Sequence, residues 1–281
     1  MIFYKWRGFI GSWVFFATTG SAIPRSIPYG LFASMLSVMY SHLDLEWIKH
    51  PTPSMTPFVS VVGFLVVYRS NLGYQRLWAG RAALATMSSK LKDVAYQLSC
   101  QTDDEAFKSE CMQLLFVFTN TIFGRYKCQP MPDVLSTLLD RGLLDHRECQ
   151  KLERAAQPAT LVWRWLYYKV SVHSRDGGFF TSAPIQSRTY QMMSDFNVQY
   201  NNANSLRDTP FPFAFAQTYF FSLLVLLVVV PWNVAAYVTD TTAAAVTSFC
   251  IVTMFFTINF AAALLESPFG ERALAPGACG S

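Results

Sequence analysis

Two long uncharged runs in the last quarter of this 281-residue chain constrain its fold more than any other feature. Phe211–Val230 has 20 residues and Ala243–Leu265 has 23. A helix of this length crosses the hydrocarbon layer of a bilayer, which is about 30 Å thick. Asp240 is the only charged residue between the two runs, so they predict a transmembrane hairpin. Trp232 and Tyr237 then serve as interfacial anchors.

The first third of the chain holds two weaker apolar runs. Ile27–Tyr40 is short for a bilayer, so we expect a first span that starts near Ser21 and is kinked at Pro28. The apolar stretch Phe9–Thr18 before it is interpreted as an interfacial helix.

The second run, Phe58–Tyr68, cannot cross a bilayer alone. Pro57 suits the first turn of a helix, where its missing N–H costs nothing. Either the helix continues past Arg69 inside a protein environment, or this is a half-span that lines an aqueous space. The sequence thus predicts four membrane segments, with both termini on one side of the membrane.

Between the membrane segments lies a polar middle, residues 69–210, with 17 of the 22 Lys and Arg and 13 of the 18 Asp and Glu. This asymmetry marks the cytoplasm-like side. Asp133 and Asp145 stand where helix N-caps are expected, and Asp176 with two glycines predicts a turn. The helices expected here are Leu72–Ser99, Asp104–Phe123, Asp133–Leu139, His146–Ala156, Leu161–His173 and Pro184–Ser205.

The predicted fold class is therefore all-α, a four-segment membrane protein whose helices extend into a cytosol-like region. We divide the chain into an N-terminal part with the first two membrane segments (1–68), a helical region (69–208), the transmembrane hairpin (209–266) and a tail (267–281). The chain is an integral, multi-pass membrane protein by this interpretation, and a plastid thylakoid and a plasma membrane are both open as its location.

Composition excludes several other classes. Hydrophobic residues make up 52% and charged residues 14%, whereas soluble chains are about a quarter charged. The net charge of +4 is scattered, with no basic cluster interleaved with aromatics, so no nucleic acid is expected. The six cysteines form no C-x-x-C pair and are interpreted as free thiols. The histidines lack metal-ligand spacing, so we expect neither a metal nor a cofactor.

The most informative motif follows the second apolar run. Arginines recur at positions 69, 76 and 81, with Tyr68, Asn71, Tyr74 and Trp78 between them. Arginines at the end of an apolar span either extend to lipid headgroups or pair with buried carboxylates, for which Asp93, Asp195 and Asp208 are candidate partners. Two further segments are Thr209-Pro210-Phe211-Pro212-Phe213 before the hairpin and Glu266-Ser267-Pro268-Phe269-Gly270 after it.

These three segments, in this order and spacing, resemble the bestrophin family over nearly the whole chain. The matching residues are Arg69, Asn71, Tyr74, Arg76, Trp78, Arg81, Pro268, Phe269 and Gly270. The resemblance implies an ion channel, usually selective for chloride or other monovalent anions and for bicarbonate in some members. It also implies a homopentamer with one axial pore, a narrow neck and a second constriction, the aperture.

Alignment on Arg69 places the neck on the helix face that carries Pro53, Pro57 and Val61, with Phe64 or Leu65 next. We take Pro57, Val61 and Phe64 as the neck residues. Such apolar rings make a dewetting constriction, for which we expect weak, permissive selectivity. The aperture candidate is Ile185, within Ala183-Pro184-Ile185. Glu271 beside Arg272 cannot supply the oxygen ligands of a calcium clasp, so the chain looks closer to the bacterial and plant-plastid branch than to calcium-gated animal members.

Other functions stay open at this point. A non-conducting subunit of a larger membrane complex would share the fold, and some family members are cation-permeable. A secondary transporter would need an internal repeat, which the sequence lacks. An enzyme is not expected, because the one tempting cluster, His173, Ser174 and Asp176, is formed by neighbours in sequence that rarely converge into a triad.

Overall fold

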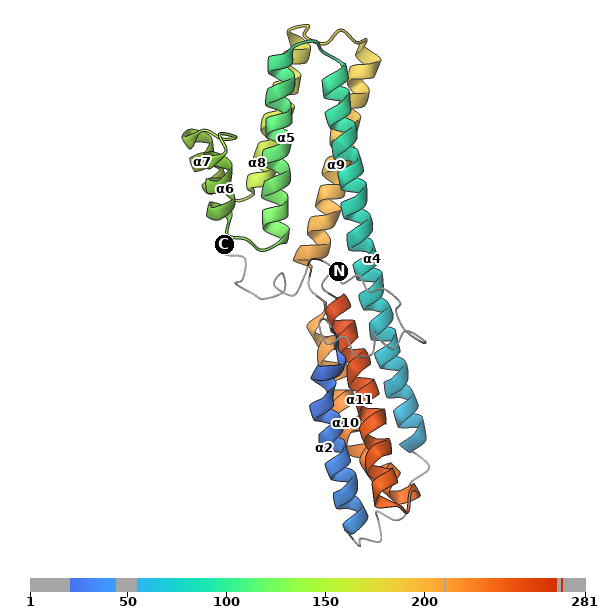
Figure 1. Cartoon of the computed structure of the whole chain (residues 1–281). Coiled ribbons are helices and arrows are strands. Elements are labelled where there is room, and N and C mark those ends of the chain that lie inside the picture. Colours follow the sequence, from blue (N-terminus) through green and yellow to red (C-terminus); the bar gives the residue numbers. More distant parts are fainter. Residues whose placement is uncertain (1–20, 44–54, 210, 267–268, 270–281) are drawn as a thin grey trace, which may run out of the picture. The chain divides into compact units, whose positions relative to one another are not determined.

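The computed structural model describes residues 21–43, 55–209, 211–266 and 269, and every regular element in these ranges is an α-helix. The described part of the chain thus confirms the all-α prediction. The chain divides into two compact units: residues 1–77 with 211–266, and residues 78–210 with 267–281. The helices (Figure 1) are α2 (Ile23–His42), α4 (Met55–Cys100), α5 (Glu105–Tyr126), α6 (Met131–Asp140), α7 (His146–Glu153), α8 (Pro158–Arg175), α9 (Ala183–Asp208), α10 (Phe213–Tyr237) and α11 (Thr241–Leu265).

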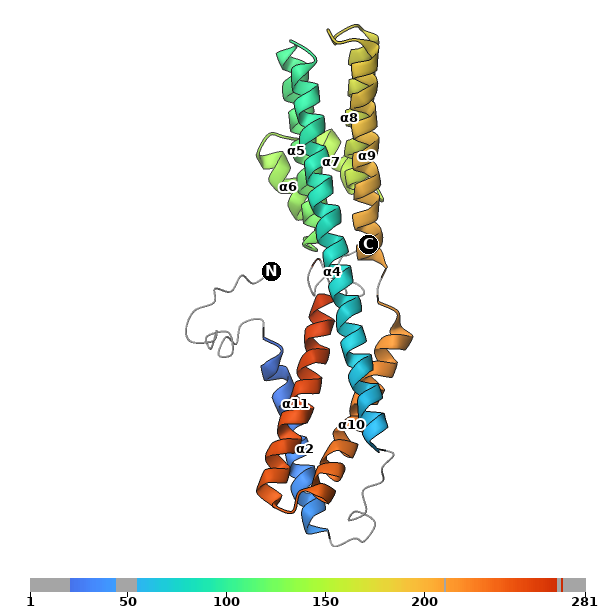
Figure 2. The ribbon, with the colours of Figure 1, turned by 90° about the vertical axis from the view of Figure 1, so that its right-hand side faces the viewer.

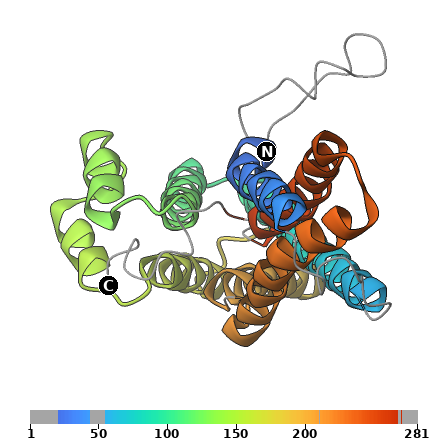
Figure 3. The same ribbon diagram turned by 90° about the horizontal axis from the view of Figure 1, so that it is seen from below.

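In the first unit, α2, α10 and α11 pack against one another and the N-terminal part of α4 lies beside them (Figure 3). The buried face of α2 carries small side chains, which allow helix backbones to approach closely in a membrane. A Cβ on Gly30 would collide with the Thr253 hydroxyl and would lie 3.0 Å from the Phe249 ring. The buried positions of α2 are Ser26, Gly30, Ala33 and Ser37.

Both helices of the predicted hairpin are present, and the first of them extends further than its uncharged run. By length and composition, α10 and α11 are the two described helices able to cross a membrane. The sequence placed the end of the first run at Val230, before Pro231, yet α10 continues through Pro231 to Tyr237. Pro231 is buried against the bundle, and neighbouring helices can accommodate the lost backbone hydrogen bond. The membrane-crossing roles of α2 and α4 stay predictions.

Helix α4 shows that the second apolar run continues as a helix past Arg69, as the first of the two alternatives requires. It ends at Cys100 and has 46 residues from Met55 onward, which is about 69 Å at 1.5 Å per residue. Pro57 lies in its first turn, as predicted, and no proline follows within the helix. The helix therefore belongs to both units.

In the second unit, the C-terminal part of α4 and helices α5, α8 and α9 lie side by side, with α6 and α7 next to α5 and α8 (Figure 2). An aromatic cluster forms the centre of this unit. The ring of Phe118 on α5 lies 4.9 Å from Trp163 on α8 and 5.3 Å from Phe196 on α9. Side chains from three helices therefore share one apolar core.

The helix ends follow the predicted capping in part. Asp145 caps α7 in a capping box with Glu148, and Gly177 has a φ of +76° in the predicted turn after α8. The expectation for Asp133 is wrong, because α6 begins at Met131. A proline at position 132 fits the first helical turn, so the helix starts before the acidic residue.

Candidate functional site

Within the first unit, one face of α4 is packed against other helices and the opposite face is exposed. Its packed face carries Val62 and Val66, each 1% exposed, and both belong to an apolar core shared with α10 and α11. The opposite face carries the predicted neck residues Pro57, Val61 and Phe64, all exposed in the single chain. The exposed fraction is 57% for Val61 and 69% for Phe64. The three residues thus form a continuous apolar stripe, and their role in a neck stays a prediction.

Arg69 is a charged residue on the packed face of α4. Only 7% of the residue is exposed, and its guanidinium binds Glu266 at the end of α11 in a bidentate manner. Nε lies 2.7 Å from Oε1, and Nη2 lies 3.1 Å from Oε2. Nη1 donates to Oδ1 of Asn259 at 2.5 Å, and the guanidinium lies 5.5 Å from the centre of the Tyr219 ring. The charge is thus satisfied by groups on α10 and α11.

This geometry corrects the choice of partners suggested by the sequence. The carboxylate bound to Arg69 is that of Glu266, whereas Asp195 pairs with Lys90 and Asp208 pairs with Arg125. The sequence contained a signal for it, because Glu266 is the carboxylate that ends an uncharged run, and such a group needs a buried cation. Asn259 and Tyr219 carried no comparable signal within their apolar helices.

The other motif residues are distributed along α4 and the tail. Asn71, Tyr74 and Arg81 are exposed, as is Trp78 in the second unit, while Arg76 is half-buried. Phe269 stacks on Tyr126 at the end of α5, with 4.9 Å between ring centres. Pro268 and Gly270 lie outside the described residues, as does the expected interfacial helix Phe9–Thr18.

Ile185, the aperture candidate, lies in the first turn of α9 and is 48% exposed. The loop before it is held by polar contacts with neighbouring helices. The Phe180 N–H donates to the Gln101 carbonyl at 3.1 Å, and the Gln186 amide donates to the Thr181 carbonyl at 2.8 Å. Ile185 is therefore exposed on a helix whose preceding loop is held in place, and its function stays a prediction.

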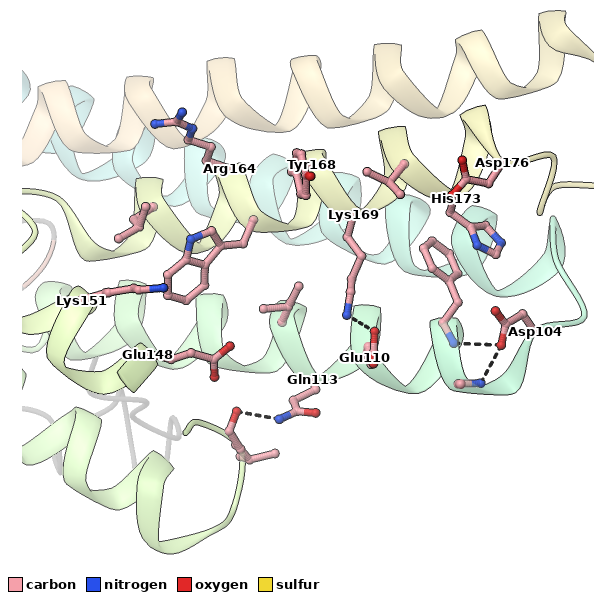
Figure 4. Close-up of a pocket in the computed structure, with 17 residues that line it drawn as sticks. Asp104, Glu110, Gln113, Glu148, Lys151, Arg164, Tyr168, Lys169, His173 and Asp176 are labelled. Atoms are coloured by element: carbon pink, nitrogen blue, oxygen red, sulfur yellow. Dashed lines mark hydrogen bonds and ion pairs between the residues drawn. The ribbon is translucent and has the colours of Figure 1, made fainter. Parts of the chain in front are cut away.

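A groove of about 970 Å³ runs between α5 and α8 and is bordered by α7 (Figure 4). Lys169 and Glu110 form an ion pair across it. Two of its carboxylates serve the fold, because Asp104 accepts from the first N–H groups of α5 and Glu148 accepts from the Asp145 N–H. Four charged groups of the groove thus have structural partners.

The tempting enzyme cluster does not form a triad. His173 Nε2 is 3.0 Å from the Thr102 hydroxyl, and its ring stacks on Phe107. Ser174 donates to the Gln186 side chain instead, and the Asp176 carboxylate pairs with neighbouring Arg175. The three groups therefore face different partners.

Metal chemistry and disulfides find no support among the residues that the structure describes. These residues contain no group of three or more His, Cys, Asp or Glu side chains placed to hold a metal ion. The five cysteines in the described ranges carry free thiols. Burial raises the pKa of the Cys111 thiol to about 12, so this thiol stays neutral at physiological pH.

Comparisons with known proteins place these features in a family. The model of a family described as bacterial and fungal bestrophin proteins matches residues 7–275. A crystal structure of a bacterial bestrophin homologue from Klebsiella pneumoniae carrying one substitution is similar, with a TM-score of 0.78 and 16% identity over 89% of this chain and 91% of that chain. Another structure of the K. pneumoniae homologue has a TM-score of 0.75 and 16% identity over 88% of this chain and 90% of that chain. No curated protein sequence matches the chain.

The helical bundle and the family match together define a membrane-integral protein of a channel family. The chain belongs to the bestrophin family, and within it to the bacterial and fungal group. The resemblance recognised in the arginine motif is thereby confirmed.

Proposed function

We propose that this chain is a subunit of a homopentameric channel that conducts chloride and similar monovalent anions through one axial pore. The exposed stripe of Pro57, Val61 and Phe64 on α4 is the observation that supports this most. One side of α4 is already packed on its own subunit, and the other presents apolar side chains with no covering helix in the described part of the chain. Five such stripes around an axis would form an apolar neck.

The charge distribution along α4 favours anions over cations. Helix α4 has five cationic residues and one carboxylate, that of Asp93. Glu266 and Asp195 pair with two of these cations, Arg69 and Lys90, and the excess of positive over negative residues on the helix creates a positive field. Because such a field raises the local concentration of counter-ions, anions are favoured near the pore. An apolar neck has no group to replace a full hydration shell, so selectivity among anions is weak and bicarbonate can permeate.

The test is planar-bilayer recording of the purified protein under a potassium chloride gradient. We expect a reversal potential on the chloride side of zero, and a single-channel conductance that changes in Phe64→Ala. The matched control is Phe221→Ala, since Phe221 on α10 is equally exposed at 67%. Equal conductance in both variants would remove the neck assignment.

Two other results distinguish the rival functions. A reversal potential on the potassium side would identify a cation-permeable family member. A stable monomer without conductance, found within a larger complex, would identify a non-conducting subunit. In the second unit, Ile185→Ala should alter conductance if Ile185 forms an aperture, and an unaltered channel would remove that assignment.

A further inference from the structure

The packed face of α4 changes character along its length. Val62, Val66, Arg69 and Gly73 follow one another at helical spacing, and all four are buried. The two valines make apolar contacts, which have no preferred direction. Arg69 and Gly73, one turn further on, make contacts that depend on the exact orientation of the helix.

Arg69 is sensitive to rotation of α4 about its own axis. The fork of its guanidinium meets both carboxylate oxygens of Glu266 while a third donor reaches Asn259. This arrangement fixes the guanidinium plane as well as its position. Adjacent helical positions differ by about 100° around the axis, so a rotation by one position would replace Arg69 with Tyr68 or Ser70 at α11.

Gly73 is sensitive to the distance between α4 and α11. A Cβ at this position would lie 3.0 Å from the Ala262 carbonyl oxygen and 3.2 Å from Cβ of Leu265. Any larger residue would push the two helices apart. Arg69 and Gly73 thus meet the same end of α11, one through orientation and the other through proximity.

We propose that Arg69, Glu266, Asn259 and Gly73 form a positioning cluster that sets which side chains α4 presents on its exposed face. This inference rests on the proposed function, because that face is the stripe assigned to the neck. The four residues would determine permeation without contacting the permeant ion. They hold Val61 and Phe64 outward and keep Val62 and Val66 covered.

The experiment measures the accessibility of single cysteines on α4 in the full-length protein reconstituted into vesicles. The exposed cysteines among the described residues, Cys100 and Cys250, are first replaced with serine, as is Cys279, which lies outside the described residues. Phe64→Cys and Val66→Cys then report on the exposed and covered faces through their rates of reaction with a membrane-impermeant methanethiosulfonate. In the parent protein, the cysteine at 64 should react and the cysteine at 66 should be protected.

Glu266→Gln and Arg69→Lys perturb the cluster in two ways. Glu266→Gln removes the negative charge, whereas Arg69→Lys keeps the positive charge and loses the fork. We expect both to raise the reaction rate at position 66 by an order of magnitude and to change the permeability ratio of chloride to larger anions. The matched control is Asp195→Asn, which breaks the ion pair of α4 with α9 and should leave position 66 protected.

The outcomes separate this inference from the proposed function. Unchanged protection at position 66 in both variants would overturn the positioning cluster even in a conducting channel. Protection retained in Arg69→Lys alone would overturn it as well, because charge balance would then suffice. If Glu266→Gln prevents assembly, Asn259→Ala tests the positioning cluster instead. This substitution removes the hydrogen bond from Arg69 to Asn259 and keeps the ion pair of Arg69 with Glu266. A parent protein that does not conduct would instead refute the proposed function, and position 66 would still test the cluster.

Discussion

Phe118 provides the most direct test of how the second unit is held together. Its side chain is 1% exposed on α5, and its ring contacts Trp163, Phe196 and Tyr200. Phe118→Ala would leave a cavity between α5, α8 and α9. The cost of truncating a buried phenylalanine is about 3–5 kcal/mol, and each aromatic pair contributes about 0.5–1.5 kcal/mol within such a total.

Phe116 is the matched control, because it lies one half-turn away on the same helix and is 45% exposed. Phe116→Ala should cost less than about 1 kcal/mol, since exposed substitutions away from special features have small effects. For a unit of this size, about 1 kcal/mol shifts Tm by roughly 2–4 °C. We therefore expect Phe118→Ala to lower Tm by on the order of 10 °C.

Thermal unfolding followed by far-UV circular dichroism in detergent, with size-exclusion chromatography to check assembly, measures both variants under the same conditions. The expected result is a large difference between the two alanine variants at unchanged oligomeric state. Equal Tm values for Phe116→Ala and Phe118→Ala would refute the shared aromatic core, because the burial that distinguishes the two positions would then have no energetic consequence.

Three further predictions follow from local geometry. Gly30→Ala should destabilise the protein by about 1–3 kcal/mol through overpacking against α11. Gly63→Ala should be tolerated, since its Cβ would lie 3.6 Å from the nearest ring atom. Thermal melts of the two variants in parallel measure this difference. A thiol reagent at pH 8 should label Cys100 and leave Cys111 unlabelled until the protein unfolds, and equal labelling rates would contradict the burial of Cys111. Because the pKa of Cys111 is raised on folding, the contribution of this thiol to stability is lost as pH rises above about 9. Asp240→Ala should lower Tm, whereas Asp240→Asn retains the cap of α11. Backbone and side-chain hydrogen bonds from Ala243 and Thr242 lower the pKa of Asp240, so the contribution of this carboxylate to stability is lost as pH falls below the ordinary aspartate range. Measuring Tm over an acid titration would follow this loss.

Local patterns predicted the elements of the fold well. The uncharged runs gave α10 and α11 because bilayer thickness fixes the length of apolar helix required. The cap at Asp145 was predictable because a capping box involves residues only three positions apart. Pro231 and Asp133 misled the prediction, since each is a boundary signal that tertiary packing or a nearby proline can override.

Only the features of the site that depend on residues near one another in sequence could be predicted. Sequence identified Arg69 as a residue that needs a buried carboxylate, but Glu266 is 197 positions away and several acids were equally plausible from sequence alone. Side-chain geometry selects the partner. The apolar neck stripe was identified through spacing on one helix, whereas its role depends on other copies of the chain, about which a single sequence holds no contact information.

The unbroken length of α4 has a consequence for how this gene can change. Inserting or deleting one residue between Met87 and Val94 would turn every later side chain by about 100°, which would bring Val94 and Leu98 out of the core that they share with Ala83 and Met87. A seven-residue insertion would nearly restore the original phase and add about 10 Å. Viable length variants of this helix should therefore differ by whole heptads.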